Sequence, residues 1–197
     1  MALIVQAGDP VLRAPARPVP AEKLGTPELD ALVAEMVATM RAAPGVGLAA
    51  PQIGVPWQLL VAEDDGEGLA QLSPEARDAR ERTALPLVAI VNPELRVVGE
   101  ARATFFEGCL SVAGWTALVT RALEIEVAGL TPMGEPLRLR LRGWPARILQ
   151  HEVDHLRGTL YVDRMHTRSF SRADAAQRWA DLPVTEIAAR LGVQLDA

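Results

Sequence analysis

The chain has 197 residues and a formal net charge of −5 at pH 7, with 49% apolar and 23% charged residues. This length suits one compact domain and is short for two, so we expect a single domain over 1–197, with a core at about 4–165 and a helical tail at about 167–197. The acidic balance argues against a nucleic-acid or anionic membrane surface as the main role. No apolar run is long enough to span a membrane, and a lone cysteine is typical of a reducing compartment, so we expect a cytoplasmic protein.

The first half of the chain predicts one helix followed by a shaped loop and a strand. Thr26 can cap a helix that begins at Pro27 and ends near Ala43. Its apolar residues recur at helical spacing: Leu29, Leu32, Val33, Met36, Val37 and Met40. The small-residue segment 45–54 is typical of a loop that leads into a strand at 58–62. Residues 63–86 are polar and predict a surface excursion with one helical turn.

The second half predicts strands around a single well-bounded helix. Strand-like runs occur at 87–92, 95–106, 118–130 and 136–142, and the last alternates leucine with arginine, which favours a solvated arginine face. Pro145 opens and Gly158 closes a helix, and further helices are expected at 171–180 and 184–191. Because strands and helices do not alternate, we expect an α+β fold, with mainly antiparallel strands packed around the central helix.

That central helix carries the sequence HEVDH at 151–155. Residues four apart stack on one helix face, so His151 and His155 can reach the same point, and Glu152 lies beside it. This spacing favours a metal site with an adjacent general base, although two incidental surface histidines remain the alternative.

A third ligand has few candidates. His166 is the only other histidine and lies in an arginine-rich stretch, where we expect a solvated side chain. Tyr161 occupies the position at which a metzincin pattern would need a histidine. Cys109 is the only cysteine; it could be a small core residue, but Glu107 and Gly108 interrupt the apolar run directly before it.

Three stretches together resemble the signatures of peptide deformylases: GVGLAAPQIG at 45–54, EGCLS at 107–111 and HEVDH at 151–155. GDPVLR at 8–13 is similar to the start of that family, and the resemblance runs from about residue 4 to 164. It implies a metal-dependent hydrolase that removes the N-formyl group from the initiator methionine of nascent polypeptides and releases formate.

The resemblance also implies the roles of individual residues. It implies Cys109, His151 and His155 as metal ligands and Glu152 as the catalytic acid and base. The side chain of Gln52 and the backbone amide of Leu110 would bind the developing oxyanion. One Fe²⁺ per chain is the implied cofactor, and Zn²⁺, Ni²⁺ or Co²⁺ can substitute for it.

A substrate site is implied beside these motifs. Apolar side chains would hold the methionine, and backbone groups would pair with an extended peptide. The residues are Gly45, Val46, Gly47, Phe105, Gly108, Trp144 and Ile148. Ordinary core packing is the alternative for the apolar ones. We also expect Glu107 to pair with Arg121.

Two regions depart from the family pattern. Ala113 and Gly114 follow EGCLSV where a proline is common, and Trp115 and Thr116 stand where an arginine is frequent, which affects the peptide-side contacts. In some relatives a basic C-terminal helix docks on the ribosome, but here acidic residues interrupt the tail arginines.

The expected partners are therefore N-formylmethionyl nascent peptides, with at most a transient ribosome contact. No direct nucleic-acid function and no membrane association are expected, and the protein should be a monomer. A zinc peptidase and a catalytically silent metal- or peptide-binding relative are the competing hypotheses. The sequence offers no third ligand that matches a zinc peptidase. The presence of Gln52, Cys109 and Glu152 together counts against a catalytically silent protein.

Overall fold

Five strands form an antiparallel sheet in the computed structural model, which describes residues 1–65 and 73–195. Their spatial order is β1 (Gly47–Ala49), β2 (Leu59–Asp64), β3 (Leu85–Val97), β6 (Glu124–Leu130) and β7 (Pro136–Arg142). A second sheet of three strands contains β4 (Arg102–Gly108), β5 (Trp115–Ala122) and the short β8 (Ser171–Arg172). All neighbouring strands in both sheets are antiparallel.

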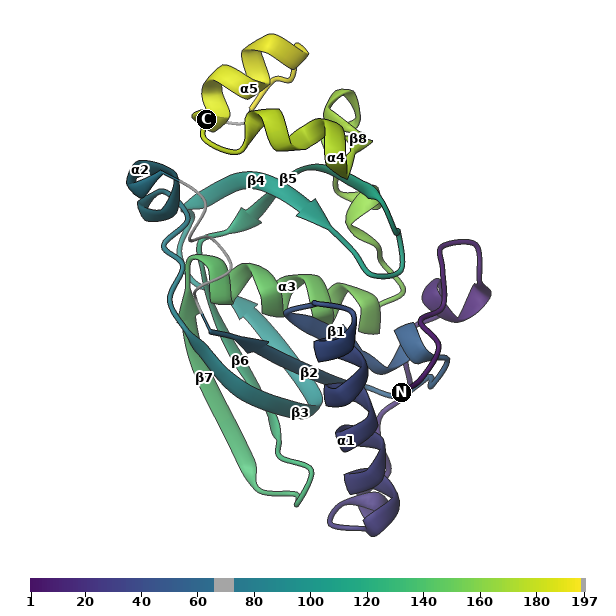
Figure 1. Ribbon diagram of the computed structural model, residues 1–197. Helices are drawn as coiled ribbons and strands as arrows, with labels where there is room; N and C mark the ends of the chain where they lie inside the picture. Colours follow the sequence, from purple (N-terminus) through teal and green to yellow (C-terminus); the bar gives the residue numbers. More distant parts are fainter. Residues whose placement is uncertain (66–72, 196–197) are drawn as a thin grey trace.

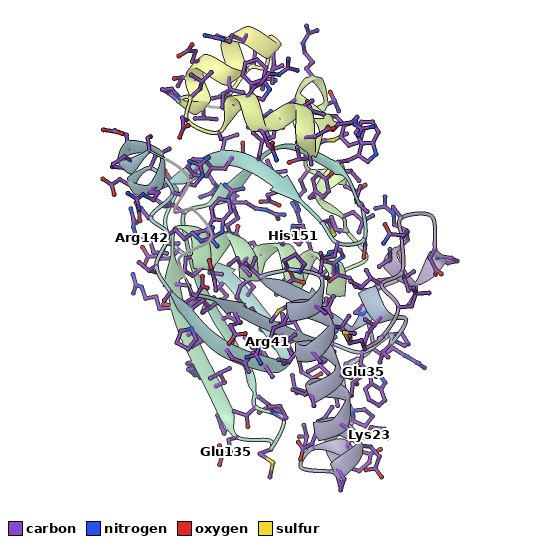
Figure 2. The ribbon with its side chains drawn as sticks, viewed as in Figure 1. Lys23, Glu35, Arg41, Glu135, Arg142 and His151 are labelled. Atoms are coloured by element: carbon purple, nitrogen blue, oxygen red, sulfur yellow. The ribbon has the colours of Figure 1, made fainter. Side chains whose placement is uncertain are left out.

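The helix α3 (Trp144–Leu156) lies between the two sheets, as Figure 1 shows. Its buried residues Ile148, Leu149 and Val153 pack with side chains of the five-stranded sheet into the largest core cluster. The predicted α+β fold, with antiparallel strands packed around the helix that carries HEVDH, is confirmed. Figure 2 shows His151 in the interior, while Lys23 and Glu135 lie at the periphery.

The remaining helices cover the outside of this arrangement. The helix α1 (Pro27–Ala42) begins as predicted, with Thr26 Oγ1 accepting from the backbone N–H of Leu29 at 3.3 Å. It packs on β1 and β2 and forms a second core cluster. The other α-helices are α2 (Pro74–Asp78), α4 (Ala173–Ala176) and α5 (Val184–Leu191). The 3-10 turns are Pro10–Leu12, Ala21–Lys23, Ala50–Ile53, Tyr161–Asp163, Thr167–Ser169 and Gln177–Trp179.

Several predicted boundaries are wrong, and each error reflects a long-range pairing. The segment predicted as one strand at 118–130 bends at Leu123, whose N–H donates to Ala101 O at 2.9 Å, and its halves β5 and β6 belong to different sheets. Similarly, 87–92 and part of 95–106 form one strand, β3, with an irregularity between Val91 and Glu94. The helix expected at 171–180 is instead β8, α4 and a 3-10 turn.

The polar excursion and the arginine row agree with expectation. Within 63–86 the structure contains the end of β2, one short helix and the start of β3, while 66–72 lie outside the described residues. On β7, Arg140 and Arg142 are exposed and pair with Glu124 and Glu81 at 2.6 and 2.7 Å. Among the helices described, none has the combination of length and apolar character needed to cross a membrane.

Candidate metal centre and active site

Three potential metal ligands converge beside α3. Cys109 follows the end of β4, and His151 and His155 lie one turn apart on α3, so two helix residues and one loop residue meet. Their ligand atoms lie within 4.8 Å of one another, and Cys109 Sγ is 3.2 Å from His155 Nε2. A thiolate and two imidazoles within this distance fit a divalent transition metal such as zinc or iron. Within the described ranges this is the only such cluster of three or more candidate side chains.

A buried carboxylate orients the first histidine. His151 Nδ1 donates to Glu107 Oε2 at 3.0 Å, and this hydrogen bond leaves the Nε2 lone pair available for a metal. Arg121 donates to both oxygens of Glu107 at 3.0 and 2.9 Å, and Arg147 donates to Oε1 at 2.6 Å. The predicted pairing of Glu107 with Arg121 is therefore present.

The charges around Glu107 determine its protonation state. Burial alone would raise the pKa of Glu107, but Arg121, His151 and Arg147 together lower it below its usual range. The pKa of His155 falls well below its usual value because of burial and the neighbouring His151. An ionised Glu107 and a neutral His155 are the forms that suit a hydrogen-bond acceptor and a metal ligand, respectively.

The ion-pair network continues beyond the site. Arg121 also donates to Asp154, and Arg164 binds the same carboxylate with contacts of 2.6 and 2.7 Å. Glu107, Arg121, Arg147 and Asp154 are all buried. Strands β4 and β5 are thereby joined to α3 by buried charged groups.

Glu152 lies next to the cluster without joining it. The side chain is 4% exposed, and Oε2 has no hydrogen-bond partner among the described residues. Burial is the main cause that raises the pKa of Glu152 to about 7. The residue at 47 must be small here, because a Cβ on Gly47 would lie 2.7 Å from Cδ and 2.8 Å from Cγ of Glu152.

Gln52 faces the same centre from the 3-10 turn after β1. Its Oε1 accepts from the backbone N–H of Ala49 at 2.8 Å, which fixes the orientation of the amide. Its Nε2 then points to Ser111 Oγ at 3.3 Å and to Cys109 Sγ at 3.6 Å. Leu110 follows Cys109 at the cavity wall, and its carbonyl accepts from Gln6 at 3.0 Å.

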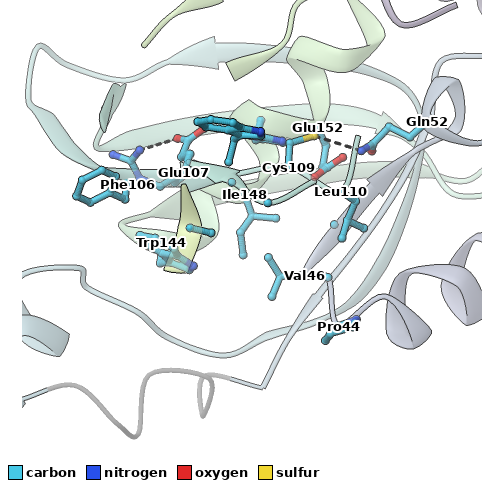
Figure 3. A pocket seen from close by; sticks show the side chains of 18 residues that line it. Pro44, Val46, Gln52, Phe106, Glu107, Cys109, Leu110, Trp144, Ile148 and Glu152 are labelled. Carbon is cyan, nitrogen blue, oxygen red and sulfur yellow. Dashed lines mark hydrogen bonds and ion pairs between the residues drawn. The ribbon is translucent and has the colours of Figure 1, made fainter. Parts of the chain in front are cut away.

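A cavity of about 370 Å³ opens beside these groups (Figure 3). Its wall includes all the proposed site residues except Phe105 and His155, the latter lying beneath the surface. Apolar side chains form much of the wall: Val46, Phe106, Leu110, Trp115, Trp144 and Ile148. The three glycines of the predicted substrate site, Gly45, Gly47 and Gly108, line it as well.

The expectation that Phe105 lines this cavity is corrected by the structure. Phe106 and Glu107 of β4 both line the cavity, whereas Phe105 does not. The ring of Phe105 instead meets Trp144 edge-on at 6.1 Å and lies under the guanidinium of Arg147 at 5.2 Å. Strand alternation gave no signal for Phe106, because Glu107 lies on the same face as Phe105 and still lines the cavity.

Other residues near the centre carried no recognisable signal. Arg147 and Asp154 lie within the α3 sequence as ordinary charged residues, and their burial follows from the second sheet on top of the helix. Tyr161 is 1% exposed, and its ring lies 6.3 Å from that of His151. His166 is half-buried rather than solvated, because its Nε2 lies 2.8 Å from Thr120 Oγ1.

The fold and the site together define a metal-dependent hydrolase in which an HExxH helix lies between two antiparallel sheets. A family model described as "Polypeptide deformylase" matches residues 1–171. The chain belongs to this family, whose members remove the N-formyl group from the initiator methionine of nascent polypeptides, and it is an enzyme of this kind.

Individual relatives and solved structures agree with this assignment. The chain is 47% identical over 190 residues to the chloroplastic peptide deformylase 1A of Solanum lycopersicum, covering 96% of this chain and 67% of the relative. It is 46% identical to peptide deformylase 3 of Streptomyces avermitilis, covering 98% and 84%. The Met-Ala-Ser-bound class I type b peptide deformylase of Acinetobacter baumannii superposes with a TM-score of 0.73 at 34% identity, covering 83% and 98%.

Proposed function

We propose that this deformylase holds one Fe²⁺ through Cys109, His151 and His155, within a single catalytic domain spanning 1–197. The convergence of these three donors within 4.8 Å is the observation that carries the proposal. The tail 167–197 is included because β8 pairs with β5. We further propose that the protein acts as a monomer.

Glu152 would move the proton in the reaction. The metal, when bound, supplies Lewis acidity that activates water and polarises the formyl carbonyl. Glu152 Oε2, which has no partner among the described residues, can take the proton of the attacking water and pass it to the leaving amine. Its burial keeps bulk water away from this transfer.

Two donors would stabilise the negative charge that develops on the formyl oxygen. Gln52 Nε2 is turned toward Cys109 because Oε1 is anchored on the Ala49 amide. The backbone N–H of Leu110 is the second donor in this proposal. Donors held in place before the reaction stabilise an oxyanion without reorganisation.

The chemistry is tested by comparing two substrates. Protein prepared without oxygen and loaded with Fe²⁺ should release formate from formyl-Met-Ala and leave the internal bonds of an unblocked peptide intact. Cleavage of the unblocked peptide would support the zinc-peptidase alternative, and no turnover of either would support a silent binding protein.

The identity of the metal leads to a separate prediction. Protein purified without oxygen should carry about one equivalent of Fe²⁺ and lose activity in air, because a thiolate-bound ferrous site is oxidisable. Metal analysis and formate release, measured on the same samples, check this. Full activity in an air-exposed sample that contains only zinc would contradict the iron assignment while leaving deformylation intact.

The methionine pocket is proposed to comprise Val46, Phe106, Trp144 and Ile148, with peptide-pairing backbone at Gly45, Gly47 and Gly108. Replacing the substrate's methionine by glycine should lower kcat/KM at least ~10-fold through lost apolar burial. Phe106→Ala should reduce this preference. Met133→Ala is the control, because Met133 is exposed and does not line the cavity, and it should retain the preference. Equal rates on formyl-Gly and formyl-Met peptides would mean that these side chains serve only the core.

The cellular setting is proposed on similar grounds. We propose a cytoplasmic location, which is consistent with the lone cysteine expected in a reducing compartment. Contact with the ribosome is proposed to be transient, since the tail's Arg172 and Arg190 are paired with Asp174 and Glu186 within the tail itself.

A further inference from the structure

An exposed aromatic pair lies at the rim of the active-site cavity. The rings of Trp115 and Phe170 stack with centroids 4.7 Å apart and planes 9° apart. Trp115 is 42% exposed and Phe170 39% exposed, although each ring covers one face of the other. Large aromatic side chains normally bury most of their surface, so a stacked pair held open to solvent calls for an explanation.

The backbone holds this pair in place. Trp115 begins β5 and pairs with Arg172 of β8, which places Phe170 beside it from a segment more than fifty residues away in the chain. Phe170 follows the buried Ser169, whose Oγ accepts from Leu118 N at 2.8 Å and donates to His166 O at 2.6 Å. Figure 1 shows β8 and α4 next to the start of β5. The two rings are thus ordered before any ligand arrives.

The pair is continuous with the catalytic cavity. Trp115, Gly114 and Ala173 line the same cavity as Cys109 and Glu152, and the N–H of Ala173 donates to Gly114 O at 2.9 Å. Trp115 itself lines the cavity, and Phe170 stacks on it. The adjacent Arg172 and Asp174 pair with each other at 3.0 Å, so neither charge is left unpaired beside the rings.

We propose that Trp115 and Phe170 form a subsite for apolar and aromatic side chains of the nascent peptide downstream of its methionine. This inference rests on the deformylase function. A substrate whose formyl group lies at the metal centre must leave the cavity through its open side, and an extended chain advances about 3.3 Å per residue. Trp115 lines this open cavity with Phe170 stacked beside it, and aromatic side chains stack well on such rings.

The test measures a ratio within each protein variant. Peptides of the form formyl-Met-Ala-Gly-Gly-Gly are compared with versions that carry phenylalanine at the third, fourth or fifth position. In the unmodified enzyme, one position should raise kcat/KM by about 5-fold over glycine, the order expected from one added aromatic contact. Trp115→Ala and Phe170→Ala should bring this ratio close to one, and Trp115→Phe should retain most of it.

Met133→Ala is the matched control, because Met133 is another exposed apolar residue, 62% exposed, and does not line the cavity. It should keep the full ratio. If Trp115→Ala and Phe170→Ala only weaken the active site in general, kcat/KM will fall equally on the phenylalanine and glycine peptides and their ratio will not change. That result would overturn the proposal. The same ratio in every variant would also overturn it and would assign the pair to another role, such as contact with a second copy. Failure of the unmodified enzyme on formyl-Met-Ala would instead refute the deformylase function.

Discussion

Replacing Glu152 should abolish proton transfer while the metal stays bound. Glu152 lies beside the three donors, and the proposed ligand set does not include it. Glu152→Ala should therefore keep near-stoichiometric metal and lose at least ~10²–10⁴-fold in kcat. Glu152→Gln is the matched variant, because it preserves the side-chain shape that packs against Gly47. If Glu152→Gln loses as much kcat as Glu152→Ala, the missing carboxylate is responsible and altered packing is not.

The ligand variants should behave in the opposite way. His155→Ala removes one of three protein donors and should lose the metal, and activity with it. Cys109→Ser preserves size but offers a poor oxygen donor, so it should weaken metal binding far more than Glu152→Ala does. Metal content and formate release are measured on all the variants. The ligand set would be refuted if Glu152→Ala lost the metal while Cys109→Ser kept both metal and activity. Cys109 would then be a core residue and not a ligand.

Removing the charge at Arg121 should have the largest effect on stability. Its side chain is 4% exposed and binds both Glu107 and Asp154, so Arg121→Met leaves two buried carboxylates with less compensation. Breaking a buried pair by removing one partner costs ~3–5 kcal/mol in the free energy of unfolding. We expect about 3 kcal/mol, the lower end of that range, because Arg147 still contacts Glu107 and Arg164 still contacts Asp154.

Arg164→Met is the matched control for this measurement. It removes a partner of the same Asp154, but the Arg164 side chain is 45% exposed, so the loss should stay below ~1 kcal/mol. Urea unfolding of metal-loaded protein, at one fixed metal concentration, measures both variants. If both variants lose the same free energy of unfolding, the burial of Arg121 does not make its ion pairs more important for stability than the exposed pair of Arg164.

Local patterns were sufficient for the helices that matter to the site. The i, i+4 spacing of His151 and His155 places both rings on one face of any α-helix, whatever surrounds it, and α3 has this form. Thr26 and Pro27 likewise identify the start of α1, and α5 occupies the predicted residues. The fold class could be inferred because strands surround α3 without regular alternation with helices.

Strand boundaries and facing residues were less predictable. The strand-like run continues through Leu123 and contains no information about which sheet each half joins, so 118–130 was predicted as one strand. Strand alternation also did not predict which of Phe105 and Phe106 lines the cavity: Glu107 shares the face of Phe105 and binds Arg147 of α3, yet Phe106 is the ring that lines the cavity.

The sequence by itself determined the chemistry available to this protein: a thiol, two imidazoles on one helical face and an adjacent carboxylate. Only the tertiary structure decided how these groups are supported and approached. Glu107 reaches His151 from 44 residues away, Arg121 reaches Asp154 from 33, and Phe170 reaches Trp115 through the pairing of β8 with β5. Helical periodicity is a local property of the chain, whereas these contacts depend on how the second sheet pairs its strands and packs against α3, which no local pattern specifies.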